Sequence, residues 1–545
     1  MEFRKVSLIL LIAVVAFWIT QGLDLWDSGY IVGYSWRIVN GELPYRDFYY
    51  KGPPATIFLW AWIMKTLPVF GQFFYLKLIN WLLFLLQTHL WFKGIQLGLD
   101  WKIPYPKLMY FLGLVFSVQF FPMYPWPTTD GLLYTAIAFY LWALSNKKNR
   151  VNFYIPLIGL FTIAAALTKQ SYYCIPIVFI ISTALRYKPL NVIYLLFIQF
   201  VTLTLFIWGI SQFTTLKEFL SHTMGETTVT DLIYSGFLNY FYDYKQRETL
   251  WILLGTASIF MLIYNLKIKA PWKISFQNIA ILWGIFGLIW SIVISIQEGS
   301  RVLTIALAFS CLGWFNRDSK DRNKAAVLFC IGMVAWACAI SLGYPYPIFM
   351  GTSLLILLIW LVTNRFPKYT SYFQGMMFIG VLIGTIYQFK PYAEKPINTL
   401  RYNIGAFSPK FAGIKTSKVH FDKLNELKIL HFKYPNKRQI VAPNCAFYYY
   451  AMDIKNPLPA DWLLNWEIHR DPKTILQIAS RKESVIFVEK SFIQGNDEFM
   501  TSNRADFSIV TDYIVRYFQK INETKYFLVY KGSTLNAPLP QTSKT

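Results

Sequence analysis

The chain has 545 residues, of which 55% are hydrophobic and only 15% are charged, and its mean hydropathy is +0.37. A soluble domain carries about 25% charged residues, so this composition excludes an ordinary soluble protein. The formal net charge is +23, which in a soluble protein would suit nucleic-acid binding. Here the basic residues lie in short loops between apolar segments, as in the cytoplasmic loops of membrane proteins. We therefore expect membrane lipids, and not nucleic acid, around this chain.

The N-terminal segment is predicted to be an uncleaved first membrane span. Arg4 and Lys5 precede an apolar run over residues 6–20, and no small-x-small cleavage site follows it. This arrangement places the N-terminus in the cytoplasm.

Further apolar segments of roughly the length that crosses a bilayer, about 20 residues, follow along the chain. With the first span they bring the predicted total to about thirteen. They are expected at residues 73–93, 105–121, 130–145, 152–168, 171–185, 190–210, 249–265, 276–296, 301–315, 325–341, 345–363 and 371–389.

The positions of the basic residues support one orientation, because cytoplasmic loops are enriched in Lys and Arg. All six loops predicted to be cytoplasmic are basic. The intervening loops then face outward, including 297–300 and two long ones at residues 23–70 and 212–248. The cytoplasmic loops contain Lys102 and Lys107; Lys147, Lys148 and Arg150; Arg186 and Lys188; Lys267, Lys269 and Lys273; Arg317, Lys320, Arg322 and Lys324; Arg365 and Lys368.

An odd number of spans leaves the polar C-terminal part, residues 390–545, outside the membrane. Strands are expected at 438–442, 484–489 and 526–530, and helices at 421–432, 472–479 and 509–521. The predicted fold is therefore a polytopic α-helical membrane domain, residues 1–389, followed by a small extracytoplasmic α/β domain. That domain contains no glycine-rich phosphate loop or nucleophile motif, so we expect it to be a structural or substrate-guiding cap.

The first long outer loop combines acids with cations close to the membrane surface. Asp24 and Asp27 follow the first span directly, and partial desolvation there raises the basicity of a carboxylate. Arg46 and Lys51 lie further along the loop, and both cation types bind phosphate well. A simpler alternative is that the two acids cap the helix expected at residues 31–39, and that Arg46 only pairs with Asp47. A second interfacial helix is expected at 55–67.

The order of residues in this loop resembles the GT-C superfamily of membrane glycosyltransferases, especially its protein O-mannosyltransferase and aminoarabinose-transferase branch. Looser similarities occur at Thr168-Lys169-Gln170 and at Ser300-Arg301. The resemblance is carried by Asp27-Ser28-Gly29-Tyr30, then by Asn40-Gly41-Glu42-Leu43-Pro44-Tyr45-Arg46-Asp47-Phe48, and by Lys51-Gly52-Pro53.

The resemblance implies transfer of a sugar from a polyprenyl-phosphate donor to a protein, lipid or glycan acceptor on the outer face of a cytoplasmic (inner) membrane, with inversion. By position, Asp27 would be the general base and Lys51 would contact the donor phosphate, together with Arg46 and, more weakly, Arg301. Such enzymes commonly use no cofactor and no bound metal. Possible substrate contacts are Asp47, Tyr50, Lys169 and Gln170.

Two residues depart from the pattern of this branch. Many relatives have Glu after the key Asp, where this chain has Ser28, so Asp24 stays an alternative base. Tyr50 stands where relatives often have His, which affects the acceptor side. Lys169 also fits a lysine that snorkels to the interface, and Arg301 also fits a surface pair with Glu298.

Two other functions are compatible with many spans. A secondary transporter or flippase is disfavoured because the chain shows no matching repeat halves, has few charges in mid-span and carries a long outer loop rich in acids and bases. A polysaccharide polymerase or ligase usually carries its large outer loop late in the chain, whereas here the informative loop follows the first span.

Overall fold

The computed structural model describes residues 16–118, 124–147, 151–224, 234, 236, 248–269, 271–294, 296–314, 319–340, 347–388, 397–444, 446–465, 467–468, 471–494 and 507–533. Most of the predicted first span and most of the second long outer loop lie outside these residues.

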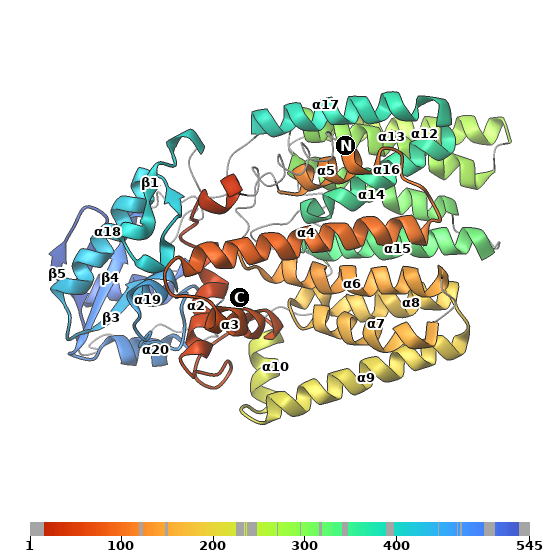
Figure 1. The fold of residues 1–545 in the computed structure, drawn as a ribbon. Coiled ribbons are helices and arrows are strands. Elements are labelled where there is room, and N and C mark those ends of the chain that lie inside the picture. The colour runs from red at the N-terminus through yellow and green to blue at the C-terminus, as the bar shows by residue number, and fades with distance from the viewer. Residues whose placement is uncertain are drawn as a thin grey trace.

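Long apolar helices run side by side and form the larger part of the molecule (Figure 1). Every span predicted from residue 73 onward overlaps one of them within the described residues. The helices are α4 (Gln72–Gly98), α5 (Pro106–Val118), α6 (Pro127–Lys147), α7 (Val151–Ala166), α8 (Ile175–Arg186), α9 (Pro189–Ser211), α12 (Glu248–Lys267), α13 (Trp272–Val293), α14 (Ile296–Trp314), α15 (Ser319–Ala339), α16 (Gly351–Arg365) and α17 (Thr370–Gln388).

The outer loop predicted at residues 297–300 is wrong. α14 already begins at Ile296, so the connection from α13 is shorter than expected. The reason is local: Gly299 packs closely on α13, where a Cβ at this position would lie 2.6 Å from the carbonyl oxygen of Gly287. The helix therefore continues through the polar residues that suggested a loop.

In the described part of the chain, four helical segments are long and apolar enough to cross a membrane: α4, α9, residues 273–293 of α13 and residues 322–339 of α15. Shorter apolar helical segments occur within α5, α7, α12 and α16. The total of about thirteen spans stays a prediction.

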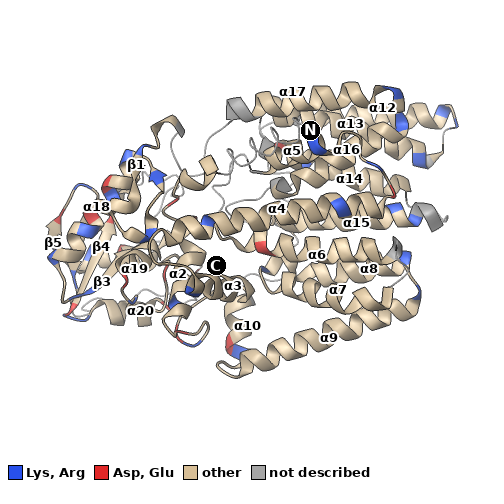
Figure 2. Ribbon diagram, in the orientation of Figure 1, with Lys and Arg blue, Asp and Glu red and all other residues tan. Residues whose placement is uncertain are grey.

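One end of the bundle carries basic side chains packed on tryptophan rings. Lys273 of α13 and Lys324 of α15 each place Nζ 3.9 Å from the centre of the Trp314 ring. Arg186 at the end of α8 lies 4.4 Å from the centre of the Trp142 ring. Figure 2 shows Lys and Arg at this end of the bundle, away from the C-terminal domain. Basic and aromatic residues together are typical of a cytoplasmic membrane interface.

At the opposite end, α2 (Asp27–Val39) and α3 (Ala55–Thr66) lie between the bundle and the C-terminal domain (Figure 1). α10 (Leu216–Met224) follows α9 nearby, and its Phe219 ring lies 5.2 Å from that of Tyr45 in the first outer loop. Both interfacial helices expected in this loop therefore occur as helices. α2 is largely buried by protein, however. α3 exposes Trp62, so α3 alone presents the apolar surface typical of an interfacial helix.

The C-terminal domain contains a four-stranded sheet in the order β3 (Arg438–Ala442), β4 (Ser484–Glu489), β6 (Phe527–Lys531), β5 (Gln519–Glu523). β3 and β4 are parallel and the other pairs are antiparallel. Its helices are α18 (Lys418–Lys433), α19 (Ala446–Met452), α20 (Pro472–Ala479), α21 (Lys490–Gln494) and α23 (Ile509–Tyr517).

β3, β4 and α20 have the bounds expected from the sequence. The helix expected at 509–521 ends at Tyr517, because residues 519–523 pair with β6 as an exposed edge strand. Short elements complete the chain: η1 (Gln170–Cys174), η3 (Pro347–Met350), η4 (Pro367–Tyr369), η5 (Ile397–Thr399), η6 (Ile404–Ala406), η7 (Pro409–Phe411), and the paired β1 (Tyr402–Asn403) and β2 (Lys415–Thr416).

Two glycines bring α2 close to α19 of the C-terminal domain. A Cβ at Gly33 would lie 2.8 Å from the Cβ of Ala446 and 2.9 Å from Oδ2 of Asp461. A Cβ at Gly29 would lie 3.2 Å from the backbone nitrogen of Phe447. Residues four apart share one helix face, so this glycine face allows the close approach. The C-terminal domain is thus packed directly on the first outer loop.

Candidate functional site

Asp24 is buried and acts as a backbone acceptor at the start of α2. Its Oδ1 accepts the N–H of Trp26 at 2.9 Å and its Oδ2 accepts that of Asp27 at 2.7 Å. Burial raises the pKa of Asp24 to about 6, against the lowering effect of these bonds. Both carboxylate oxygens therefore accept the N–H groups of the N-cap residue Trp26 and of the first helical residue Asp27, a role close to the capping considered from the sequence.

Asp27 is the first residue of α2 and is half-buried. Residues three and seven positions further along lie on the same helix face, and these are Tyr30 and Tyr34. The Asp27 carboxylate therefore begins a face of α2 that continues along these two tyrosine rings. This face differs from the glycine face that packs on α19.

The tyrosine face of α2 contacts aromatic residues from three parts of the chain. The centre of the Tyr30 ring lies 4.6 Å from that of Trp462 in the C-terminal domain and 6.1 Å from that of Trp126, before α6. The Tyr34 ring lies 5.0 Å from Tyr50 of the first outer loop. These rings bring the first outer loop, the start of α6 and the C-terminal domain to one place.

Glu467 adds a buried carboxylate to this cluster, and the sequence did not indicate it. Its side chain is largely buried, and the Tyr30 hydroxyl donates to Oε2 at 3.3 Å. Burial raises the pKa of Glu467, while the positive charge of Lys51 and the Tyr30 hydrogen bond oppose the rise. Lys51 itself is half-buried.

The turn between α7 and η1 holds the backbone of Lys51. The side-chain amide of Gln170 donates to the Lys51 carbonyl at 2.6 Å and to the Thr223 carbonyl of α10 at 3.1 Å. The neighbouring Lys169 donates from Nζ to the Thr128 hydroxyl at 3.2 Å. Burial lowers the pKa of Lys169 to about 8, so its charge is lost at mildly alkaline pH.

Tyr50 is fully buried, and its hydroxyl has no hydrogen-bond partner among the described residues. Burial first, and then the charges of Glu467 and Asp130, raise the pKa of Tyr50. Asp130, in the first turn of α6, accepts the indole N–H of Trp60 at 2.9 Å. Asp130 was not among the residues predicted from the sequence, although an acid at the outer end of an apolar span was a usable signal.

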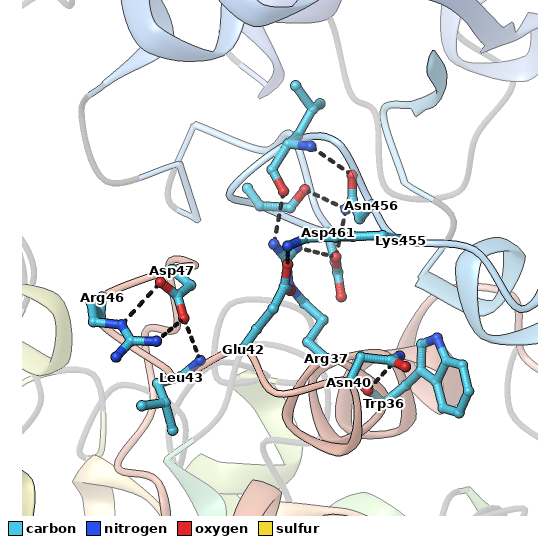
Figure 3. A network of polar contacts seen from close by, with 12 residues as sticks. Trp36, Arg37, Asn40, Glu42, Leu43, Arg46, Asp47, Lys455, Asn456 and Asp461 are labelled. Atoms are coloured by element: carbon cyan, nitrogen blue, oxygen red, sulfur yellow. Dashed lines mark hydrogen bonds and ion pairs between the residues drawn. The ribbon is translucent and has the colours of Figure 1, made fainter. Parts of the chain in front are cut away.

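Unlike Lys51, the arginines Arg37 and Arg46 both form ion pairs within the protein. Figure 3 shows Arg37 directed at Glu42 and Asp461, and Arg46 and Asp47 as a separate pair. Arg37 lies 2.6 Å from Glu42 and 2.8 Å from Asp461, and all three side chains are buried. The Arg46–Asp47 pair, at 2.7 Å, is exposed, as in the simpler alternative from the sequence.

Arg301 lies within α14, not at the opening of a span as expected, and is buried. α14 packs against α13, α15, α16 and η3. Its expected partner Glu298 accepts the indole N–H of Trp290 at 3.0 Å. The predicted contact of Arg301 with a donor phosphate stays a prediction.

The structure thus brings together Tyr50, Lys51 and Gln170 through direct contacts, with Lys169 adjacent in the chain. Asp27 lies on the same face of α2 as Tyr30 and Tyr34, whose rings contact Tyr50. Asp24 accepts backbone N–H groups at the start of α2. Arg46 and Asp47 form an exposed ion pair. In the residues that the structure covers, no group of three or more His, Cys, Asp or Glu side chains could hold a metal ion.

No protein-family model matches the chain, and no curated protein matches it. Two solved structures, both from Archaeoglobus fulgidus, are similar at 10% identity. The oligosaccharyltransferase in complex with zinc and sulfate aligns with a TM-score of 0.42 over 95% of this chain and 70% of that chain. The oligosaccharyltransferase AglB, in complex with an inhibitory peptide and a dolichol-phosphate, aligns with a TM-score of 0.44 over 99% and 75%. Similarity this weak carries no conclusion about function, so the function is argued from the residues of the site.

Proposed function

We propose that the chain is a membrane glycosyltransferase that moves a sugar from a polyprenyl-phosphate donor to an acceptor at the outer face of the membrane. The observation that carries the proposal is the position of Lys51. Gln170, at the start of η1, holds the Lys51 backbone, and the preceding residue Tyr50 packs on the Tyr30 and Tyr34 rings of the α2 face that Asp27 begins. Its ammonium has no hydrogen bond or ion pair within 4.0 Å among the described residues, which leaves it available for an anion.

The reaction that suits these residues is a single displacement. An oxygen of the acceptor attacks the anomeric carbon, the bond from that carbon to the phosphate oxygen breaks, and the electron pair leaves with the polyprenyl phosphate. Asp27 takes the proton of the acceptor group, a step that typically contributes 10²–10⁴-fold. The Lys51 ammonium stabilises the charge that grows on the leaving phosphate.

The hydrogen bonds around the two acids favour Asp27 over Asp24 as the base. Both oxygens of Asp24 accept backbone N–H groups at the start of α2, and such a carboxylate is committed to the helix. Lys51 is assigned before Arg46, which pairs with Asp47 in solvent, and before Arg301. We propose the donor and the acceptor only by chemical class: the donor is a polyprenyl-linked sugar, and the acceptor is a protein, lipid or glycan.

The proposal is tested in a strain that lacks this chain and is complemented with variants. Glycans of the cell envelope are profiled by mass spectrometry, and membrane insertion is checked by immunoblotting. We expect the wild-type chain and Arg46→Ala to restore a glycan that Asp27→Asn and Lys51→Met do not restore. An envelope profile that is identical with and without Asp27→Asn would overturn the enzymatic role of this residue.

A transporter is separated by a second measurement. Membrane vesicles are loaded with a labelled polyprenyl-phosphate sugar, and label is followed with and without acceptor extract. A transferase attaches label to an acceptor and moves none across the bilayer in its absence. Movement of label without any acceptor contradicts the proposal.

A further inference from the structure

Lys77 is a charged residue near the start of α4, and its side chain is fully buried. Its Nζ donates to the Gln21 carbonyl at 2.7 Å and to the Gly22 carbonyl at 3.2 Å. An ionisable residue inside a membrane helix is costly and marks a functional position by default. Both carbonyls belong to the segment that joins the predicted first span to α2, so Lys77 acts on this segment.

The segment at residues 21–23 turns at Gly22, whose φ is +77°. Glycine adopts this left-handed conformation without steric cost, and the two successive carbonyls reach the same ammonium. The Gly22 N–H donates to the Lys415 carbonyl at 2.9 Å, and Nδ1 of His420 donates to the Leu23 carbonyl at 3.0 Å. Lys415 and His420 belong to the C-terminal domain, so α4 and that domain hold one short segment together.

Asp24 connects this segment to Asp27. It follows Leu23 directly, its Oδ2 accepts the N–H of Asp27 at 2.7 Å, and its carbonyl accepts the Ser28 hydroxyl. A continuous series of hydrogen bonds and peptide bonds therefore leads from Lys77 to the residue proposed as the base. A shift of the 21–23 segment moves the start of α2, where Asp27 lies.

We propose that Lys77, together with His420, is a positioning residue of the transfer reaction: the two side chains fix residues 21–23 and so set the place of the Asp27 carboxylate. This inference rests on the proposed function. A lysine ammonium has three N–H donors and can serve two carbonyls at once. Methionine is of similar length but donates nothing, so the two buried carbonyls lose their donor and the turn shifts towards other partners.

A second buried lysine provides the matched control. Lys410 also donates to a backbone carbonyl, that of Tyr450 at 2.8 Å, and it pairs with the exposed Asp453 at 3.1 Å. Its Nζ lies 3.7 Å from the centre of the Trp36 ring, in the half of α2 away from Asp27. Lys410→Met therefore removes a buried ammonium from the same junction without disturbing the segment that leads to the base.

The experiment measures transfer and binding on the same variants. Transfer is the amount of the dependent envelope glycan in the complemented strain, relative to the amount of chain in the membrane. Binding is that of a polyprenyl monophosphate to the purified full-length chain in detergent, followed by quenching of tryptophan fluorescence. The melting temperature of each purified variant is recorded as well.

Lys77→Met is expected to lower transfer by about 10²-fold, the cost of a misplacement of about 1 Å. The dissociation constant of the polyprenyl monophosphate should stay unchanged, because Lys51 is not touched. Lys410→Met should lower the melting temperature and keep its transfer. Unchanged transfer by Lys77→Met, or an equal loss of transfer and of binding, would each overturn the inference.

His420→Phe acts on the same segment from the C-terminal domain. It removes one donor where Lys77→Met removes two, so we expect the same pattern with a smaller loss of transfer. This variant decides the matter where Lys77→Met does not insert into the membrane, and full transfer by His420→Phe would then overturn the inference.

Failure of the inference is distinguishable from failure of the proposed function, because Asp27→Asn is measured beside these variants. If Asp27→Asn abolishes transfer and Lys77→Met behaves as Lys410→Met does, only the positioning role is overturned. If Asp27→Asn retains full transfer, the proposed base is overturned, and the inference with it.

Discussion

Buried charges at the junction of the first outer loop and the C-terminal domain fall into two groups. Arg37 is fully paired: its guanidinium contacts Glu42, Asp461 and the Leu458 carbonyl at 2.6–2.9 Å. Lys51 is half-buried, and among the described residues its ammonium has no hydrogen bond or ion pair within 4.0 Å. A planar guanidinium that binds three separate acceptors suits a permanent structural contact, and a compact ammonium on a flexible side chain suits a ligand that binds and dissociates.

The paired guanidinium predicts a stability effect. Arg37→Ala leaves the buried Asp461 without its cation, whereas Glu42 keeps its ion pair with the exposed Lys455 at 2.8 Å. Breaking a buried pair in this way costs about 3–5 kcal/mol. We expect a clear drop in the melting temperature of the detergent-purified chain and faster proteolysis of the C-terminal domain. Arg46→Ala, which removes an arginine from an exposed pair, should melt as the wild type does. Equal melting of both variants would contradict the importance of the Arg37 joint.

Lys169 predicts a limit on activity at alkaline pH, given the proposed function. Its pKa is lowered to about 8 by burial, so the cation is present below that pH and is lost as the pH rises through it. If the cation assists the donor, activity falls roughly tenfold per pH unit above the pKa. Lys169→Arg keeps its charge and should move the falling limb to higher pH. The exposed control Lys65→Arg should leave the limb in place, and a limb unmoved by Lys169→Arg would count against the role.

The sequence indicated the acids and cations of the first outer loop as candidate site residues, but it did not indicate which role each of them has. Asp24 and Asp27 look equivalent in the sequence, and only the backbone bonds at the start of α2 distinguish them. Glu467 lies 437 residues from the tyrosine that it contacts, and no local pattern around it resembles a site. Arg37 looks like a surface residue of an amphipathic helix because its partner Asp461 is equally remote in sequence.

At the scale of elements, the helices of the bundle follow from local composition. A long run of apolar residues predicts a helix at that place in the chain without any knowledge of distant contacts. The predicted spans overlap the observed helices for that reason. β5 was missed because residues 519–523 become a strand only through pairing with β6. The same applies to α14, whose polar first turn is helical because Gly299 allows close contact with α13.

The glycine face of α2 gives a test at this scale. Gly33→Ala places a methyl group 2.8 Å from the Cβ of Ala446, and overpacking of this kind costs about 1–3 kcal/mol. We expect a lower melting temperature. Ala446→Gly in the same chain should restore part of the loss, since the contact with Asp461 remains.

The matched control for Gly33→Ala is Gly255→Ala in α12, where a Cβ meets nothing within 4 Å. Alanine is the better helix former by about 1 kcal/mol, so this change should leave the melting temperature unchanged or raise it. Two variants that behave alike would show that the α2–α19 contact adjusts without cost.

For the whole molecule, the C-terminal domain is bound to the first outer loop along several independent contacts. The Tyr49 backbone N–H donates to the Pro459 carbonyl at 2.7 Å, and its hydroxyl donates to Asp471 at 3.0 Å. The Phe73 ring at the start of α4 packs on Phe447 at 5.2 Å. The sequence indicated a cap on the membrane domain, whereas the contacts show a domain that shares its core with α2 and α4.

The charge distribution of the whole molecule predicts its orientation. Basic loops lie at the bundle end away from the C-terminal domain (Figure 2), and an excess of Lys and Arg marks the cytoplasmic side. We expect Lys437→Cys, exposed after α18, to react with a membrane-impermeant maleimide in right-side-out vesicles. Lys188→Cys, exposed between α8 and α9, should react only in inverted vesicles. The wild-type chain gives the background, because Cys174 and Cys311 are partly exposed, whereas Cys330 and Cys338 are buried. The reverse labelling pattern would place the candidate site on the cytoplasmic side, where a donor carried on the outer leaflet cannot reach it.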